Sequence, residues 1–448
     1  MNEKNENYWL LEAPATKAIW HMALPMMLGM SVNILYNITD TFFIGQLQNT
    51  AALSAIALLL PYTTILMAIG NLFGTGGSTL FSRLIGTQDD QKAKQCAATT
   101  FWLAAGAGIL AAILSLLGQN QIIAVLGGDS ATFFYLKQYL VWYALGAPLI
   151  VANFTLEQLV RGNGESIHSM IGMILSVAIN IVLDPILMFA CHLGMQGAAI
   201  ATVLGNLAAV VYYAIIMRIQ AGPLTIAPGH IQFRKALLKP IFSVGVSAMM
   251  LDLLLIVSSL MFNYYALQYG DYVLAGFGIS QKLVQIVDLI GMGLYLGVIP
   301  LIAVAYGANN KTRMKQILSK TTFYLGLLIT ILFAGLFVFR HPIVRCFTQN
   351  RDVIQIGSFI LTVQLCSSFF AAGAGLLTSV FQAKGEGTPA LILSISRGLI
   401  LIPTIMILHS LFGLHGVIFS LLTTEVLSFF VGLALYAHDK RKETGLLG

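Results

Sequence analysis

Two acidic residues in long apolar stretches carry the chemistry that this sequence offers. Tyr36 precedes Asp40 by four positions and Asn180 precedes Asp184 by four, a spacing that places each pair on one face of a helix. Thr202 falls at a similar distance from the end of a third apolar stretch. Two carboxyl groups brought together in a partly dry site favour sharing one proton. The pattern predicts a polar cluster that binds and releases a proton.

The composition places these residues in a membrane. Of the 448 residues, 57% are hydrophobic and 9% are charged, whereas about 25% are charged in an ordinary soluble domain. The mean hydropathy is +0.83. These values exclude a soluble enzyme. An ionisable group near the centre of a bilayer costs at least about 2.5 kcal/mol, so each buried acid needs a partner or a wet cavity.

Twelve apolar segments are long enough to cross a bilayer as helices, which takes about 20 residues. The sequence therefore predicts an all-α integral membrane protein with twelve transmembrane helices. No nucleotide loop or nucleophile motif indicates an enzyme, and the four cysteines lack metal-ligand spacing, so we expect no cofactor and no metal. The expected spans cover residues 19–45, 51–82, 97–118, 133–160, 167–191, 195–217, 237–268, 273–306, 318–339, 353–382, 389–411 and 414–437.

The two halves of the chain repeat each other without a gap. Six residues of the first half match residues of the same type in the second: Gly70, Gly76, Gly86, Lys94, Gln95 and Thr100 with Gly291, Gly297, Gly307, Lys315, Gln316 and Thr321. Shorter matches pair 161–164 with 384–387 and 193–197 with 412–416. Six spans per half is an even number, so a pseudo-two-fold axis along the membrane normal must relate two six-helix lobes.

This repeat sets the expected domain organisation. A polar segment at 1–18 leads into an N-terminal lobe at 19–217, and a basic linker at 218–236 joins it to a C-terminal lobe at 237–437. Residues 438–448 form a tail. We expect a substrate cavity between the lobes that opens to each side of the membrane in turn.

The basic residues indicate how the chain is oriented. Eighteen of the 24 Lys and Arg residues fall in segments on the side of the termini, and only Lys137, Arg340, Arg345 and Arg351 fall on the other side. Segments rich in Lys and Arg stay in the cytoplasm. We therefore expect a multi-pass protein of the inner, or plasma, membrane with both termini cytoplasmic. The basic residues form no continuous stripe, so nucleic acid is not an expected partner.

A second group of ionisable residues lies within the expected spans of the C-terminal lobe. The repeat gives Asp40 no acidic counterpart there, because Met261 takes its place. One interpretation is a mutually paired network that lines the cavity, and the other is a site for a cationic substrate or a second coupling ion. With two asparagines of the first lobe, this group makes up the predicted substrate cavity: Asn33, Asn153, Asp252, Lys282, Asp288, Arg397 and Glu425.

Two segments near the start of the chain, LPMMLGMSVNILYNITDTFFIGQL and ALSAIALLLPYTTILMAIGNLFGTGGSTLFSRLIG, resemble the multidrug and toxic compound extrusion (MATE) family. The resemblance covers nearly the whole chain. The surroundings of Asp40, together with Asn180 and Asp184, are similar to the DinF-like branch, and the first span also resembles the MepA-like group. The resemblance implies two six-helix lobes in a V shape and efflux of organic cations or amphipathic compounds against protons or sodium ions. It also implies that Asp40, Tyr36, Asn180, Asp184 and Thr202 form the proton-linked cluster.

We therefore expect a monomer, surrounded by membrane lipids, that exports small organic compounds in exchange for protons. Sodium is the second candidate for the coupling ion. A flippase for a lipid-linked precursor is the alternative function, but it needs cationic groups to hold a pyrophosphate, and only Lys282 and Arg397 are candidates. The buried acids and the two-lobed repeat argue against a channel.

Overall fold

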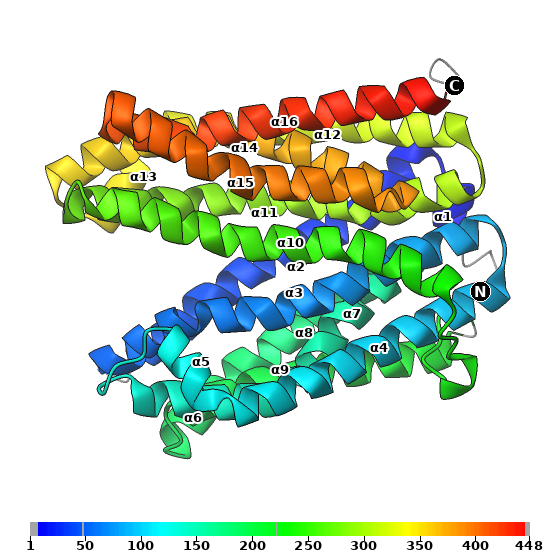
Figure 1. Cartoon of the computed structure of the whole chain (residues 1–448), viewed down its shortest axis with the longest axis horizontal. Helices are drawn as coiled ribbons and strands as arrows, with labels where there is room; N and C mark the ends of the chain where they lie inside the picture. Colours follow the sequence, from blue (N-terminus) through cyan, green and yellow to red (C-terminus); the bar gives the residue numbers. More distant parts are fainter. Residues whose placement is uncertain (1–7, 47–48, 221, 444–448) are drawn as a thin grey trace.

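The computed structural model is almost entirely helical and describes residues 8–46, 49–220 and 222–443, without the side chains of 33–38, 40–42, 44, 45 and 443. Long helices run side by side in two bundles that diverge toward one end (Figure 1). The first and last helices of the chain reach the opposite end, which we call the terminus end (Figure 1). We call the other the far end.

The first bundle contains the helices that precede residue 220. A short helix α1 (Tyr8–Leu11) leads into it. Its helices are α2 (Ala15–Gly45), α3 (Thr50–Gly86), α4 (Asp90–Leu117), α5 (Gln119–Val125), α6 (Phe133–Leu145), α7 (Ala147–Gly162), α8 (Ser166–Pro185), the π-helical turn η1 (Ile186–Ala190) and α9 (Met195–Ile219).

The second bundle follows a connection that contains the 3₁₀ turn η2 (Pro228–His230). Its helices are α10 (Lys235–Leu267), α11 (Asp271–Gly307), α12 (Lys311–Val338), α13 (Arg340–Phe347), α14 (Arg351–Lys384), α15 (Gly387–Phe412) and α16 (Leu414–Glu443).

Ten helices in the described part of the chain are long and apolar enough to cross a membrane, and α6 with α7 makes an eleventh if the bent pair counts as one span. The bend is 56°, where the sequence predicts a single span at 133–160. Pro148 lies in the first turn of α7, and proline starts a helix readily because its missing N–H has no partner there. Helix α2, with 31 residues, is about 46 Å long at 1.5 Å per residue, enough to cross as well.

The internal repeat is visible in the backbone at the start of α4 and α12. Gln88 and Asn309 have φ angles of 58° and 52°. The next residues, Asp89 and Asn310, cap the helices by accepting hydrogen bonds from backbone N–H groups three residues later. Both pairs obey the register of the predicted repeat, so the two halves begin these helices in the same way.

The same comparison tests the two shorter matches. Gly194 and Gly413 have φ angles of 52° and 57°, which agrees with the match of 193–197 to 412–416. Gly164 and Gly385 have φ angles of 92° and 84° and lie in the main register. The predicted match of 161–164 to 384–387 is therefore wrong by two residues, because it aligned glycines with different backbone conformations.

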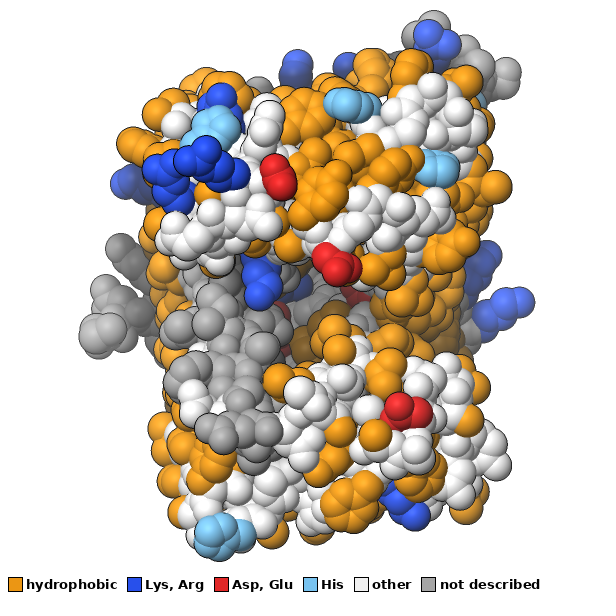
Figure 2. Space-filling model, turned by 90° about the vertical axis from the view of Figure 1, so that its left-hand side faces the viewer, with side chains coloured by type: hydrophobic (Ala, Val, Ile, Leu, Met, Phe, Trp, Pro, Cys, Tyr) orange, Lys and Arg blue, Asp and Glu red, His pale blue; other side chains and the backbone are white. Residues whose placement is uncertain are grey.

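The bundles touch through glycines in the half of the molecule nearer the terminus end. A Cβ on Gly86 would lie 2.3 Å from the carbonyl oxygen of Val304, and one on Gly307 would lie 2.2 Å from that of Arg83. The two contacts are related by the repeat register, so they form one symmetric crossing of α3 and α11. Farther out the bundles separate, and Figure 2, which looks at the far end, shows a hollow between them.

Candidate functional site

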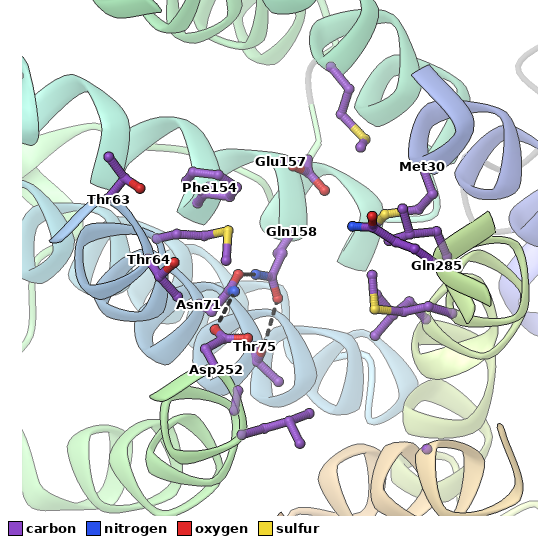
Figure 3. A pocket seen from close by; sticks show the side chains of 18 of the residues that line it. Met30, Thr63, Thr64, Asn71, Thr75, Phe154, Glu157, Gln158, Asp252 and Gln285 are labelled. Atoms are coloured by element: carbon purple, nitrogen blue, oxygen red, sulfur yellow. Dashed lines mark hydrogen bonds between the residues drawn. The ribbon is translucent and has the colours of Figure 1, made fainter. Parts of the chain in front are cut away.

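A cavity of about 570 Å³ lies between the bundles. Helices α2, α3, α6, α7 and α8 line it from one side, and α10, α11 and α14 line it from the other. Its walls combine methionine, leucine and aromatic side chains with nearly as many polar ones (Figure 3). Apolar side chains interspersed with polar groups that can orient a ligand are typical of sites for small organic molecules.

A chain of hydrogen bonds crosses this cavity from one bundle to the other (Figure 3). Asn71 on α3 donates to Asp252 on α10, with 2.7 Å between Nδ2 and Oδ2. Gln158 on α7 donates to the Asn71 Oδ1 at 2.7 Å, and Thr75 donates to the Gln158 Oε1 at 2.8 Å. Asp252, predicted as a cavity residue, does line the cavity, where it faces polar groups of the opposite bundle.

An ion pair on α7 also lines the cavity. Arg161 lies 3.5 Å from the Glu157 carboxylate, and the two side chains are only 5% and 10% exposed. The expected span ends at residue 160, which places Arg161 among the basic residues outside the membrane on the terminus side, and Glu157 is not among the predicted site residues. The structure corrects this, because α7 continues to Gly162 and both side chains are buried. The signal was present in the sequence as an acid and a base four positions apart.

Three of the five predicted proton-coupling residues meet in the first bundle. The Asn180 amide lies between Asp184 and Thr202. In the amide orientation that satisfies both neighbours, the Asn180 nitrogen donates to Asp184 Oδ2 at 3.1 Å. The Asn180 oxygen then accepts from the Thr202 N–H and from the Thr202 hydroxyl, each at 3.2 Å. Asp184 and Asn180 are buried. The α-helix gives way to the π turn η1 directly after Pro185, and such turns often occur at functional sites.

Asn153 belongs to this cluster rather than to the described cavity lining. It donates to Asn206 at 2.8 Å, and Asn206 donates to the carbonyl oxygen of Thr202 at 2.8 Å. The side chains of Asn33, Tyr36 and Asp40 lie outside the described residues. Their helix α2 packs along α8, which carries Asn180 and Asp184.

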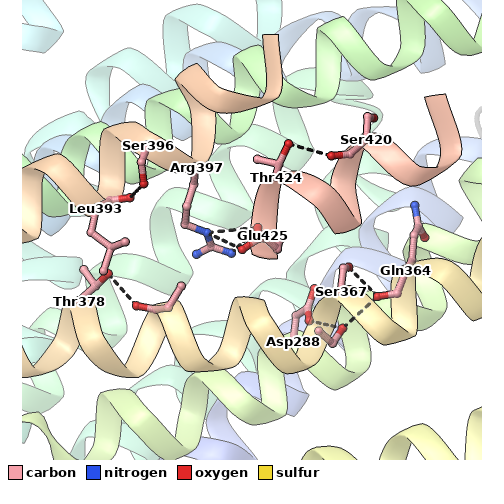
Figure 4. Close-up of polar contacts among 12 residues, drawn as sticks. Asp288, Gln364, Ser367, Thr378, Leu393, Ser396, Arg397, Ser420, Thr424 and Glu425 are labelled. Carbon is pink, nitrogen blue, oxygen red and sulfur yellow. Dashed lines mark hydrogen bonds and ion pairs between the residues drawn. The ribbon is translucent and has the colours of Figure 1, made fainter. Parts of the chain in front are cut away.

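Three of the five predicted ionisable residues of the second bundle interact electrostatically with one another. Arg397 makes a two-pronged contact with Glu425, at 2.8 Å from Nη2 and 3.1 Å from Nε (Figure 4). Asp288 accepts from the Ser368 hydroxyl at 2.8 Å, and Lys282 is exposed. Asp288, Arg397 and Glu425 thus form one charged group. Asp252 bonds across the cavity instead, so the interpretation of a paired network that contains all five residues is wrong.

Two basic residues make buried contacts at the terminus end of the cavity. One of them, Arg83, connects the two bundles. Arg83 of α3 donates to the carbonyl oxygens of Ala383, at 3.0 Å, and Gln382 at the end of α14, where the helix dipole is negative. Lys384 is buried between Asp439 and Glu386. Burial raises the pKa of the Glu386 carboxyl above its usual range, although Lys384 acts in the opposite direction.

The described residues contain no group of three or more His, Cys, Asp or Glu side chains that could hold a metal ion. The candidate site combines a cavity between the bundles, two carboxylates on its wall and a separate buried polar cluster.

The sequence profile described as MatE matches residues 25–186 and 248–407, with one match in each bundle. The chain belongs to the MatE family. This confirms the family prediction, and since MatE proteins are transporters it also confirms that the chain is not an enzyme.

Relatives named multidrug export protein MepA cover almost the whole MatE chain. The protein from Staphylococcus haemolyticus (strain JCSC1435) is 37% identical over 426 residues, which are 95% of this chain and 94% of that protein. The protein from Staphylococcus aureus (strain MSSA476) is 37% identical over 420 residues, 94% of this chain and 93% of that protein. These relatives agree with the resemblance to the MepA-like group.

Solved structures confirm the fold. One, described as the outward-facing conformation of a multidrug resistance MATE family transporter, has a TM-score of 0.92 at 23% identity and covers 99% of both chains. Another, described as MATE in the bent conformation, has a TM-score of 0.91 at 23% identity and covers 98% of both. The predicted all-α fold with twelve membrane-spanning helices is therefore confirmed. With the family match and the MepA relatives, the apolar helices show that the protein is a multi-pass membrane transporter.

Proposed function

We propose that this MatE protein exports small amphipathic or cationic organic compounds by alternating access. The cavity between the bundles carries this proposal. It combines apolar side chains with the carboxylate of Asp252, and its volume of about 570 Å³ suits a drug-sized molecule. The MepA relatives, which are named multidrug export proteins, support export as the function.

We propose that protons drive the export through the predicted cluster of Asp40, Tyr36, Asn180, Asp184 and Thr202. The support is the contact of Asn180 with both Asp184 and Thr202 and the packing of α2 along α8. One proton that crosses about 100 mV and one pH unit supplies roughly 3.7 kcal/mol. That energy sustains a gradient of about 500-fold, so one proton per cycle is sufficient.

The lipid-linked precursor flippase is not favoured by the cavity. Among its described lining residues the one basic side chain is Arg161, which Glu157 already neutralises. Of the two cationic candidates from the sequence, Arg397 is bound to Glu425, and neither it nor Lys282 is among the described residues that line this cavity. A pyrophosphate needs several free cationic donors, because each must balance its charge.

Transport by purified protein in vesicles tests the proposal. A fluorescent organic cation is followed under an imposed pH gradient and, separately, under a sodium gradient, for the wild type and for Asp40→Asn. We expect the pH gradient to drive uptake by the wild type, and Asp40→Asn to bind the dye without driven uptake. Driven uptake under the sodium gradient alone would assign sodium as the coupling ion, and dye uptake under neither gradient would contradict the export proposal.

We further propose that the protein works as a monomer with its terminus end in the cytoplasm. One chain supplies all the helices that line the cavity, and most basic residues fall on the terminus side. The test places a single cysteine at His230, in η2, in a variant whose four native cysteines are replaced. An impermeant thiol reagent should label it only after the cells are opened, and labelling in intact cells would reverse the orientation.

A further inference from the structure

The far end of the second bundle carries a group of basic residues that the transport mechanism does not use. Arg340, His341 and Arg345 lie on the short helix α13, and Arg351 is the first residue of α14. Asp352 is the acidic residue next to them in the chain. Figure 2 shows Lys and Arg side chains gathered beside a His at one corner of the far end, away from the central hollow. These arginines are exceptions to the excess of Lys and Arg on the terminus side of the protein.

Helix α13 has one buried face and one exposed face. Val344 is fully buried, and its Cγ1 lies 3.4 Å from the position that a Cβ on Gly357 of α14 would occupy. His341 and Arg345 are exposed, and their spacing of four residues places them together on one side of the helix. The helix is therefore held on α14 with its basic side turned outward.

Large apolar side chains flank the basic residues. Val338, Phe339 and Phe347 are 65%, 58% and 56% exposed. Val338 is the last residue of the membrane-spanning helix α12, Phe339 joins it to α13, and Phe347 is the last residue of α13. The end of a span marks the depth of the lipid headgroups. Arginine beside exposed aromatic and aliphatic side chains is the composition of an amphipathic helix that lies in this interface.

Two arginines of this surface form no ion pair with a carboxylate in the described part of the chain. Arg340 is held in place, since it donates to the carbonyl oxygen of Phe337 at 2.7 Å and lies 4.3 Å from the centre of the Phe337 ring. Arg345 and Arg351 are exposed, and no carboxylate in the described part of the chain forms an ion pair with either. Two guanidinium groups remain for an external anion.

We propose that α13 and the first turn of α14 bind the headgroup of an anionic phospholipid in the leaflet at the far end. Guanidinium groups pair well with phosphate oxygens because they offer several donors in one plane. Phe339 and Phe347 enter the adjoining acyl region, which a soluble anion does not offer. The lipid fixes the height of the second bundle in the membrane while the first bundle moves against it.

Native mass spectrometry of the purified full-length protein tests this surface. Phosphatidylglycerol is titrated against phosphatidylcholine for the wild type and for Arg345→Gln/Arg351→Gln, which leaves the structurally engaged Arg340 in place. We expect the double variant to bind phosphatidylglycerol about 25-fold more weakly, about fivefold for each arginine near a charged lipid surface. Phosphatidylcholine binding should not change. The matched control is Lys137→Gln, a basic residue at the far end of the first bundle, which should keep wild-type affinity.

Two further arms separate the lipid from other occupants. Phe339→Ser/Phe347→Ser should also weaken the lipid while retaining all the arginines, and millimolar inorganic phosphate should not displace it. Unchanged lipid affinity in the arginine variant, equal loss in Lys137→Gln, or complete displacement by phosphate would each overturn the proposal. A dimer mass that disappears in the arginine variant would assign the surface to a second copy of the chain instead.

Discussion

Two buried polar sites, one in each bundle, use different partners for a carboxylate. In the first bundle, Asp184 contacts the Asn180 amide, which also contacts Thr202. In the second bundle, Glu425 is held by the guanidinium group of Arg397. An amide donates a hydrogen bond without carrying charge, whereas a guanidinium stays protonated at every working pH.

This difference shows that the repeat conserves the helices but not their chemistry. Arg397 provides the second bundle with a cation that is attached to the protein, so Glu425 is balanced throughout the cycle. A carboxyl group beside an amide is balanced differently, because it can take up a proton from solution and release it again. We infer that proton exchange belongs to the site of Asp184 and structural support to the pair of Arg397 and Glu425.

After the loss of driven uptake expected for Asp40→Asn, the largest effect on transport is expected at Asp184. Asp184→Asn keeps the volume and a hydrogen bond to Asn180 but cannot exchange a proton, so we expect proton-driven export to fall at least about tenfold, or 1.4 kcal/mol. Dye binding should change little. Vesicle transport with a parallel binding titration measures both. Full transport by this variant would show that Asp184 does not exchange the coupling proton and would break the comparison.

A separate effect, on stability and not on transport, is expected in the second bundle. Arg397→Met leaves the Glu425 carboxylate without its ion-pair partner, and we expect this to lower the free energy of unfolding by about 3 kcal/mol. The double variant Arg397→Met/Glu425→Leu should regain most of that loss. Thermal unfolding in detergent gives the values. If the single and double variants unfold alike, the pair has no structural role.

Substrate recognition should distinguish Asp252 from Asp288. Asp252 lines the cavity, so Asp252→Asn should weaken binding of a cationic dye about fivefold, the loss of roughly 1 kcal/mol. Asp288→Asn is the matched control, because Asp288 bonds to Ser368 and is not among the described lining residues. Dye titrations of both variants give the answer. A larger loss in Asp288→Asn would move the substrate site into the second bundle.

The smallest effect is expected from hydroxyl groups that support each site. Thr202→Val removes the hydroxyl that contacts Asn180, and Ser368→Ala removes the donor to Asp288. We expect about a twofold to threefold slower proton-driven export for Thr202→Val, since one neutral hydrogen bond contributes about 0.5 to 1 kcal/mol. Ser368→Ala should transport normally. Initial rates of dye uptake compare them, and equal slowing in both would erase the distinction between the bundles.

Much of the fold follows from hydropathy and the repeat. Runs of apolar residues long enough to cross a membrane mark the helices, and the contact of Asn180 with Asp184 follows from a spacing of four residues. The bend between α6 and α7 did not follow, because a short break within a long apolar run leaves the average hydropathy unchanged. Boundaries of α4 and α12 were also placed seven residues too late, since their first turns are charged and extend past the apolar region.

Less of the candidate site could be predicted from the sequence. Asn71 and Gln158 are uncharged residues in apolar helices, and nothing local shows that they meet Asp252 from the other bundle. Arg161 lies only at the end of an expected span, where a basic residue ordinarily faces water. Its burial depends on how α7 packs against its neighbours, which is a property of tertiary structure. Contacts between helices far apart in the chain are therefore what the structure adds.

The glycine contact between α3 and α11 has a mechanical consequence. At Gly86 and Gly307, backbone meets backbone, and no side chain of either residue interlocks with the opposite helix. Such surfaces separate without the rotamer changes that interlocking side chains require. The energy barrier to sliding one helix past the other is therefore low at this contact. The resistance to opening the terminus end then comes from other contacts. Arg83 bonds to the end of α14, and buried apolar side chains of both bundles, such as Phe81 and Val298, belong to one hydrophobic cluster.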